Sequence, residues 1–138
     1  DTLDQIARDW GSGKLSTDAL DTSNWSTEEW IRFLELAPEP LSIARMAELD
    51  QKFGLTKKGN AEIANRWLVL AIRNHYSAAD ARLENVLMTV GRRKFLGPLY
   101  GELKKTPEGL ARAKAIFARA KSGYHPIAAE SIGKLLEK

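Results

Sequence analysis

The most concentrated chemistry in this sequence is a run of three cations, Arg92, Arg93 and Lys94, between a glycine and a phenylalanine. The run follows an apolar stripe that ends at Gly91 and precedes another predicted helix, so we expect it to form an interhelical turn. On a continuous helix, residues two apart diverge by about 200°, whereas in a turn Arg92 and Lys94 can converge on one spot. A guanidinium binds a carboxylate through two parallel hydrogen bonds, and a helix N-terminus adds partly positive amide groups.

The pattern alone leaves three interpretations of this cluster open. Arg92 and Lys94 can form a receptor for a carboxylate or a phosphate, cap the C-terminus of the preceding helix, or contact nucleic acid. Few aromatic residues are interleaved with the basic ones for base stacking, which disfavours nucleic acid. Residues 1–50 carry four basic and eleven acidic side chains, whereas residues 91–138 carry eleven and four. Such a gradient is compatible with a solvated face, a docking surface or anion recognition.

Other catalytic signatures are absent from the sequence. It has no cysteine, which excludes disulfides, thiolate catalysis and sulfur-ligated metals. His75 and His125 are the two histidines, and neither has a partner at the spacing of a helical zinc motif, His-Glu-x-x-His. We expect His75 to be a surface or cap residue and His125 to lie at the start of a helix. Gly-rich phosphate loops and Gly-x-Ser-x-Gly elbows are also missing, so we predict no catalytic residue, no metal and no cofactor in this chain.

The elements that must position the cations are helices, because helix signals repeat and strand signals are nearly absent. Seven or eight helices are predicted, and they cover Leu3–Trp10, Ser26–Ala37, Ile43–Phe53, Asn60–Ile72, Ser77–Val90, Lys94–Lys104, Thr106–Ala120 and a last segment from Pro126. Ser77 with Asp80 is expected to cap one of them, and Gly97 with Pro98 to make the first turns of another irregular.

Short loops between these helices predict an all-α protein with residues 1–138 in a single domain. Asn60–Ile72 is apolar on nearly all sides, which favours an α-α superhelix of stacked, armadillo- or HEAT-like hairpins over a compact bundle. The four tryptophans stand at helical spacing among other apolar residues, so we interpret them as core rather than as a ligand groove. No apolar run approaches the ~20 residues of a membrane span. Because the chain begins with Asp1 rather than Met, we expect a fragment or a processed product.

Several strings resemble the C-terminal domain of leukotriene A4 hydrolases and related M1 zinc aminopeptidases. Residues 60–68 resemble the family's Asn-x-Glu-Ile-x-x-Arg-Trp-Leu string. Residues 91–100 resemble its Gly-Arg-x-Lys-Phe-x-x-Pro-Leu-aromatic segment. His125-Pro126 and Gly133-Lys134-x-Leu also match, in the same order and at similar spacing.

The resemblance implies an α-α superhelix packed against a thermolysin-like zinc domain, in a parent that removes N-terminal residues from peptides. The zinc, its His-Glu-x-x-His helix and the catalytic tyrosine would belong to upstream domains that are absent here. Arg92 is implied as the ligand of the substrate's carboxylate and Lys94 as its helper, whereas Arg93 falls on a variable position and is expected to face elsewhere. Gly97 departs from relatives that carry a bulkier or charged residue. The mammalian member also hydrolyses a fatty-acid epoxide, but no residue of this sequence indicates that activity.

We therefore expect residues 1–138 to be the helical C-terminal accessory domain of a zinc metalloaminopeptidase, inactive by itself. Its expected partners are the catalytic domain of the same polypeptide and the carboxylate end of a peptide substrate, with no nucleic acid. The alternative is a stand-alone α-solenoid scaffold that binds a partner protein. A cytoplasmic or a periplasmic location of the parent is equally compatible with the sequence.

Overall fold

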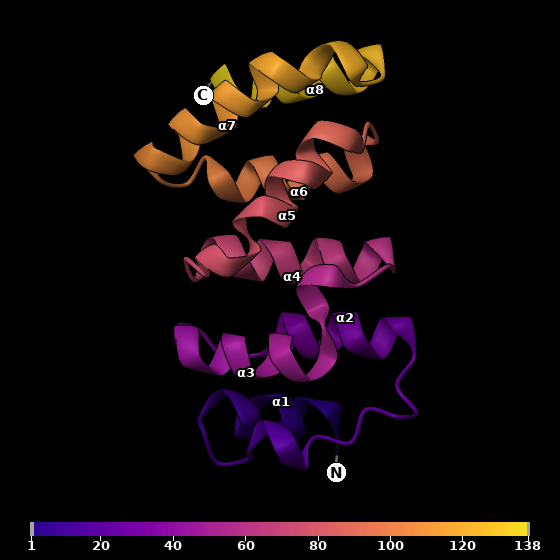
Figure 1. The fold of residues 1–138 in the computed structure, drawn as a ribbon, viewed down its shortest axis with the longest axis vertical. Helices are drawn as coiled ribbons and strands as arrows, with labels where there is room; N and C mark the ends of the chain where they lie inside the picture. Colours follow the sequence, from indigo (N-terminus) through magenta and orange to yellow (C-terminus); the bar gives the residue numbers. More distant parts are fainter. Residues whose placement is uncertain (1, 138) are drawn as a thin grey trace. The chain divides into compact units, whose positions relative to one another are not determined.

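The computed structural model describes residues 2–137, and within this range the chain forms eight α-helices and no strand (Figure 1). The all-α prediction is confirmed. The helices are α1 (Leu3–Gly11), α2 (Thr27–Leu36), α3 (Ile43–Phe53), α4 (Ala61–Arg73), α5 (Asp80–Thr89), α6 (Arg93–Leu103), α7 (Pro107–Ala120) and α8 (Pro126–Glu137). Short 3₁₀ turns cover Thr17–Ala19, Leu55–Lys57, Ser77–Ala79 and Lys121–Gly123. The chain divides into two compact units, Asp1–Tyr76 (the first unit) and Ser77–Lys138 (the second unit).

Three helices are capped by the residues at which the predicted helices start, Ser26, Asn60 and Thr106. Ser26 Oγ accepts from the amide of Glu29 at 3.2 Å, and the Glu29 carboxylate accepts from the amide of Ser26 at 2.9 Å. This capping box satisfies two amides that have no partner inside α2. The side chains of Asn60 and Thr106 accept in the same way from amides in the first turns of α4 and α7.

Two local predictions are wrong. Ser77 does not cap a helix, because the chain enters α5 through the 3₁₀ turn that contains it, and Ala79 takes the N-cap position without a side-chain bond. Helix α6 also runs without a break through Gly97 and Pro98. Proline lacks an amide hydrogen for the carbonyl four residues earlier, but one missing bond in the second turn leaves the remaining helical bonds intact. The Pro98 ring is exposed, so it displaces no core side chain.

In the first unit, α2 packs against both α1 and α4. Helix α4 is buried at seven positions, as expected from its nearly continuous apolar surface. Trp10, Trp30 and Trp67 are buried, which confirms their interpretation as core residues. Trp25 is half-buried and stands edge-on against Trp30, with 4.9 Å between the ring centroids.

A polar network closes the core of the first unit at the end of α3. The Asp50 carboxylate accepts from the amide and the hydroxyl of Thr56, at 2.8 and 2.6 Å, and from the hydroxyl of Tyr76 at 2.9 Å. The indole of Trp67 donates to the Thr56 hydroxyl at 3.0 Å. The network joins α3 to α4 across Gly54, whose φ of 63° is one that glycine adopts without strain.

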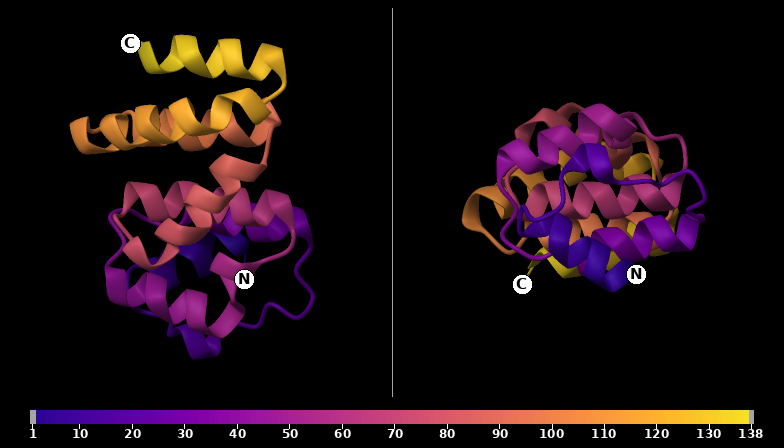
Figure 2. Two further views of the ribbon diagram at one scale, coloured as in Figure 1. Left: turned by 45° about the horizontal axis from the view of Figure 1, so that its top comes forward. Right: turned by 90° about the horizontal axis from the view of Figure 1, so that it is seen from below.

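In the second unit, α6 packs against α8, α5 packs against α7, and α7 also contacts both α6 and α8 (Figure 2). Two buried tyrosines join these helices. The Tyr124 hydroxyl donates to the carbonyl of Leu87 in α5, and it lies 2.7 Å from the hydroxyl of Tyr100 in α6. Because Tyr124 has one hydroxyl hydrogen and gives it to Leu87, Tyr100 must donate to Tyr124.

The three tyrosines of the chain are all buried, and each is held in its neutral form. Burial, followed by the hydrogen bond to Asp50, raises the pKa of Tyr76 to about 12. Burial raises the pKa of both Tyr100 and Tyr124 above the ordinary value of 10. In the unfolded chain the same phenols ionise near pH 10. Their contribution to stability is therefore complete below pH 10 and is lost as the pH rises above it.

We expect the folded chain to show no phenolate absorbance at 295 nm when the pH passes through 10. The signal should instead appear at higher pH, together with the loss of helical circular dichroism. Denatured chain provides the control, and its three phenols should titrate near pH 10. A step near pH 10 in the folded chain, with helix content unchanged, would show that at least one phenol is exposed.

Candidate functional site: a cation cluster at the start of α6

The cation cluster lies in the second unit, where α5 ends at Thr89 and α6 begins at Arg93. The intervening turn rests on the segment that leads into α8. A methyl group added at Gly91 would lie 3.5 Å from the carbonyl oxygen of Gly123 and 3.7 Å from the Cα of Tyr124. The turn is thus held close to the buried tyrosine pair, and this contact fixes the backbone from which the cations project.

Arg92 and Lys94 both extend over the ring of Phe95. The guanidinium carbon of Arg92 lies 5.9 Å from the ring centroid, and the ammonium of Lys94 lies 5.5 Å from it. These distances are within the range in which a cation is attracted to an aromatic ring. Both cations are exposed, while Phe95 is half-buried. The two charges therefore gather around one ring, with Arg92 in the turn and Lys94 in the first turn of α6.

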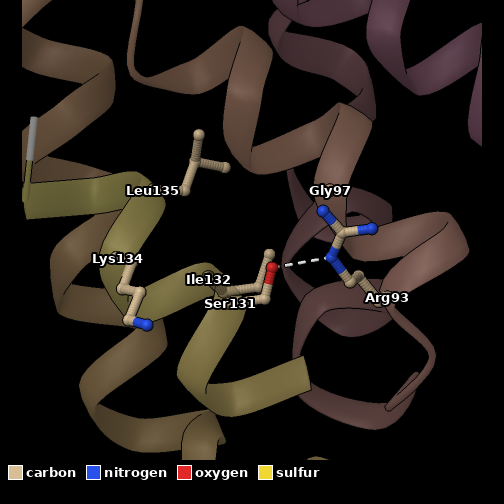
Figure 3. Close-up of a pocket in the computed structure, with 6 residues that line it drawn as sticks. All are labelled: Arg93, Gly97, Ser131, Ile132, Lys134 and Leu135. Atoms are coloured by element: carbon tan, nitrogen blue, oxygen red, sulfur yellow. Dashed lines mark hydrogen bonds between the residues drawn. The ribbon is translucent and has the colours of Figure 1, made fainter. Parts of the chain in front are cut away.

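Arg93 extends to a different helix. Its Nε donates to the hydroxyl of Ser131 in α8 at 2.6 Å. It also lines a small hollow between α6 and α8, whereas Arg92 and Lys94 are not among the residues that form this hollow (Figure 3). At the start of α6, Arg92 and Lys94 therefore lie near Phe95, whereas Arg93 lies against α8.

The N-terminus of α6 differs electrostatically from that of most helices in this chain. Within the described residues, five other helices carry an acidic side chain in the first turn, α1, α2, α4, α5 and α7. Helix α6 carries none, and Arg92 stands at its N-cap without a side-chain bond to an amide. The N-terminus of a helix is partly positive, so cations here are unfavourable and a bound anion would be stabilised.

Replacing Arg92 by serine is therefore expected to stabilise the chain. A serine at the N-cap contributes about 0.5–2 kcal/mol, and removal of the cation from the positive helix end about 0.3–1 kcal/mol more. The lost contact with Phe95 offsets about 0.5–1 kcal/mol of this. From the middle of these ranges we expect the free energy of unfolding in urea to rise by about 1 kcal/mol for Arg92→Ser. Arg92→Ala, which cannot cap, should gain less, and a loss of stability with serine would contradict this account of the helix end.

The histidines lie where a structural role explains them. His75 follows α4 with a φ of 58°, in the left-handed position of a C-terminal turn in which the amide of Tyr76 bonds to the carbonyl of Ala71. His125 precedes α8, and its Nδ1 accepts from the amide of Ile127 at 3.2 Å. Among residues 2–137, no group of three or more histidine, cysteine, aspartate or glutamate side chains is placed to hold a metal ion.

Sequence reasoning found the cations but missed the residues that support them. Ser131, Tyr100 and Tyr124 lie 24–38 positions from their partners, and no local spacing indicates these pairs. The sequence offers one indication of these contacts, the chemistry of the tyrosine side chain. A tyrosine in an apolar helix stripe usually needs a partner for its hydroxyl, so Tyr100 pointed to a buried hydrogen bond without indicating with which residue.

The chain is similar to known proteins in sequence. The family described as "Leukotriene A4 hydrolase, C-terminal" matches residues 25–136. Leucine aminopeptidase 2 of Neurospora crassa is 28% identical over 137 residues, which span 97% of this chain and 20% of that protein. Leucine aminopeptidase 2 of Pyricularia oryzae is 29% identical over 125 residues, 88% of this chain and again 20% of that protein. The chain thus spans about a fifth of the length of these relatives.

The fold is also found in a solved structure. The structure of native yeast LTA4 hydrolase superposes with a TM-score of 0.79 at 21% sequence identity, over 99% of this chain and 25% of that one. No helix within residues 2–137 combines the length and apolar character needed to cross a membrane. With a family match over most of its length and a matching helical fold, this chain belongs to the leukotriene A4 hydrolase C-terminal domain family.

Proposed function

We propose that this chain is the C-terminal accessory domain of a zinc aminopeptidase, in which Arg92 and Lys94 bind the carboxylate end of the peptide substrate. The observation that carries the proposal is the pair of exposed cations over one aromatic ring, at a helix N-terminus that has neither a side-chain cap nor an acidic residue. Three cations and the partly positive helix end would all attract a bound anion.

A carboxylate matches the chemistry of the pair. The planar guanidinium of Arg92 can donate two parallel hydrogen bonds to both oxygens of one carboxylate. Lys94 adds a compact charge with rotatable donors, which could bind the same carboxylate. Among residues 2–137 the guanidinium of Arg92 contacts the ring of Phe95, so an incoming carboxylate would displace no hydrogen bond or ion pair of this side chain.

The reaction itself would take place outside this chain. Its relatives are named leucine aminopeptidases, and the chain spans about 20% of their length. Its described residues gather no metal-binding group, so the zinc of the proposed peptidase would be held by another part of the polypeptide. This chain would pack on that part and bind the C-terminal end of the peptide. That binding would help to position the N-terminal residue of the peptide for cleavage.

The domain assignment is tested by assaying leucine anilide hydrolysis and zinc content. The 138-residue chain alone should have no activity and should lose zinc on dialysis, whereas the longer polypeptide that carries it should be active and retain zinc. Hydrolysis by the isolated chain would overturn the accessory role. An inactive, correctly folded longer polypeptide would instead favour a scaffold that binds a partner protein.

A further inference from the structure

A small open hollow lies in the second unit between the first half of α6 and the C-terminal half of α8 (Figure 3). It is lined by Arg93, Gly97, Ser131, Ile132, Lys134 and Leu135. Its volume is about 210 Å³, which is less than the roughly 300–1,000 Å³ of pockets for drug-sized ligands. The hollow can therefore hold one small group with a few attached carbons, and not a nucleotide.

The guanidinium of Arg93 is held in place at this hollow. Its Nε donates to Ser131 Oγ at 2.6 Å, a contact that joins α6 to α8. Neither terminal nitrogen of Arg93 has a hydrogen-bond or ion-pair partner among residues 2–137. Figure 3 shows Nε as the guanidinium nitrogen next to Ser131, with both terminal nitrogens farther from it. An arginine bonded through Nε presents its other N–H groups as donors, and Arg93 is exposed, so an incoming anion can reach them.

The other walls of the hollow are apolar. Ile132 is buried and Leu135 half-buried, and Gly97 contributes no side chain. A Cβ atom added at Gly97 would meet no atom within 4 Å, so the hollow exists partly because this position is glycine. Short aliphatic carbons would be removed from water here.

The positive charge at the hollow is that of one guanidinium, which matches an anion with a single negative charge. Lys134 is exposed, lies 3.7 Å from the Glu130 carboxylate, and points away from the guanidinium of Arg93. One fixed guanidinium therefore faces the cavity, and it would neutralise a monoanion but only half of a dianion. From this geometry we infer a second anion site in this chain, in which Arg93 binds a monocarboxylate that carries a short aliphatic chain.

This site is separate from the one proposed for the peptide carboxylate. Arg92 and Lys94 contact Phe95 and do not line the hollow. The two sites can therefore be disabled one at a time, and failure of one leaves the other standing.

The test is a titration of the ¹⁵N-labelled chain with hexanoate, followed by NMR. We expect saturable shifts at the Arg93 Nε–H and at the amides of Gly97 and residues 131–135, with a dissociation constant in the millimolar range. Acetate should bind at least threefold more weakly because it leaves the apolar wall in water, and hexanol should not bind because it has no charge for Arg93.

Three variants separate the hollow from the rest of α6. Arg93→Gln should weaken hexanoate at least tenfold, whereas Arg92→Ala should change its affinity less than twofold. Gly97→Leu should abolish binding by filling the cavity. Gly101→Leu is the matched control, since Gly101 also lies in α6 and a Cβ added there would meet no atom within 4 Å, but it does not line the hollow.

Several results would overturn the inference. Shifts confined to Arg92 and Lys94, or equal losses for Arg92→Ala and Arg93→Gln, would show that hexanoate uses the other site. Inorganic phosphate binding as tightly as hexanoate would exclude an aliphatic monocarboxylate as the preferred ligand. Unchanged affinity in a folded Gly97→Leu chain, checked by circular dichroism, would show that the hollow is not the site.

Discussion

Replacing Arg92 by alanine in the longer polypeptide is expected to lower kcat/KM for a tripeptide with a free C-terminal carboxylate by about 30- to 900-fold. The proposed ion pair would be shielded from water between this chain and the catalytic part. Loss of one partner of such a pair costs about 2–4 kcal/mol, much of it because the remaining charge is left unpaired. Lys94→Ala should have a smaller effect, since an ammonium makes no bidentate contact.

The same tripeptide with an amidated C-terminus is the decisive control. It has no carboxylate for Arg92 to bind, so wild type and Arg92→Ala should cleave it at similar rates. Arg93→Ala is the matched variant, because it removes an adjacent cation that bonds to Ser131 on α8 instead. Equal losses on free and amidated peptides, or equal losses for Arg92→Ala and Arg93→Ala, would contradict the proposed carboxylate contact.

Replacing Tyr124 by phenylalanine is expected to lower the free energy of unfolding by about 2–4 kcal/mol. The substitution changes side-chain volume very little, but it removes the hydroxyl at the centre of the buried network. The carbonyl of Leu87 loses its donor and the hydroxyl of Tyr100 loses its acceptor. Each buried polar group left without a partner costs about 1–3 kcal/mol.

The bond between Tyr124 and Leu87 connects this loss of stability to the cation cluster. Its carbonyl lies in the last turn of α5, where helical carbonyls lack an amide partner, and the Tyr124 hydroxyl supplies the missing donor. The same segment supports the turn at Gly91 from which the cations project. Tyr124→Phe should therefore loosen the start of α6 as well as lower stability.

Tyr100→Phe is the matched comparison, since it removes one donor but leaves Tyr124 bonded to Leu87. It should cost only about 1 kcal/mol, the usual net value of one hydrogen bond. Urea denaturation followed by circular dichroism gives the stabilities, and native-state hydrogen exchange shows whether amides of α5 and α6 open more often. Equal stability losses for the two variants would show that the Leu87 carbonyl does not depend on Tyr124.

Local signals determined the helices of this chain. The capping box of Ser26 and Glu29 and the caps at Asn60 and Thr106 depend on spacings of two to three residues, which a single sequence displays in full. Ser77 failed as a cap although it has similar spacing, because Ala79 is buried and the chain turns through a 3₁₀ turn there. Packing outweighed a local preference of about 1 kcal/mol.

In the candidate site, too, local sequence indicates some features and tertiary packing decides the others. The order of Arg92, Arg93, Lys94 and Phe95 and the preceding helix end indicate a cluster of cations where one helix ends and the next begins, since all of these residues lie within one turn of chain. Sequence could not show that Arg93 bonds to Ser131, 38 residues away, or that Tyr124 supports Leu87, 37 residues away. Such contacts depend on which helix faces pack together, and that choice is made by the summed burial of many apolar side chains rather than by any one spacing.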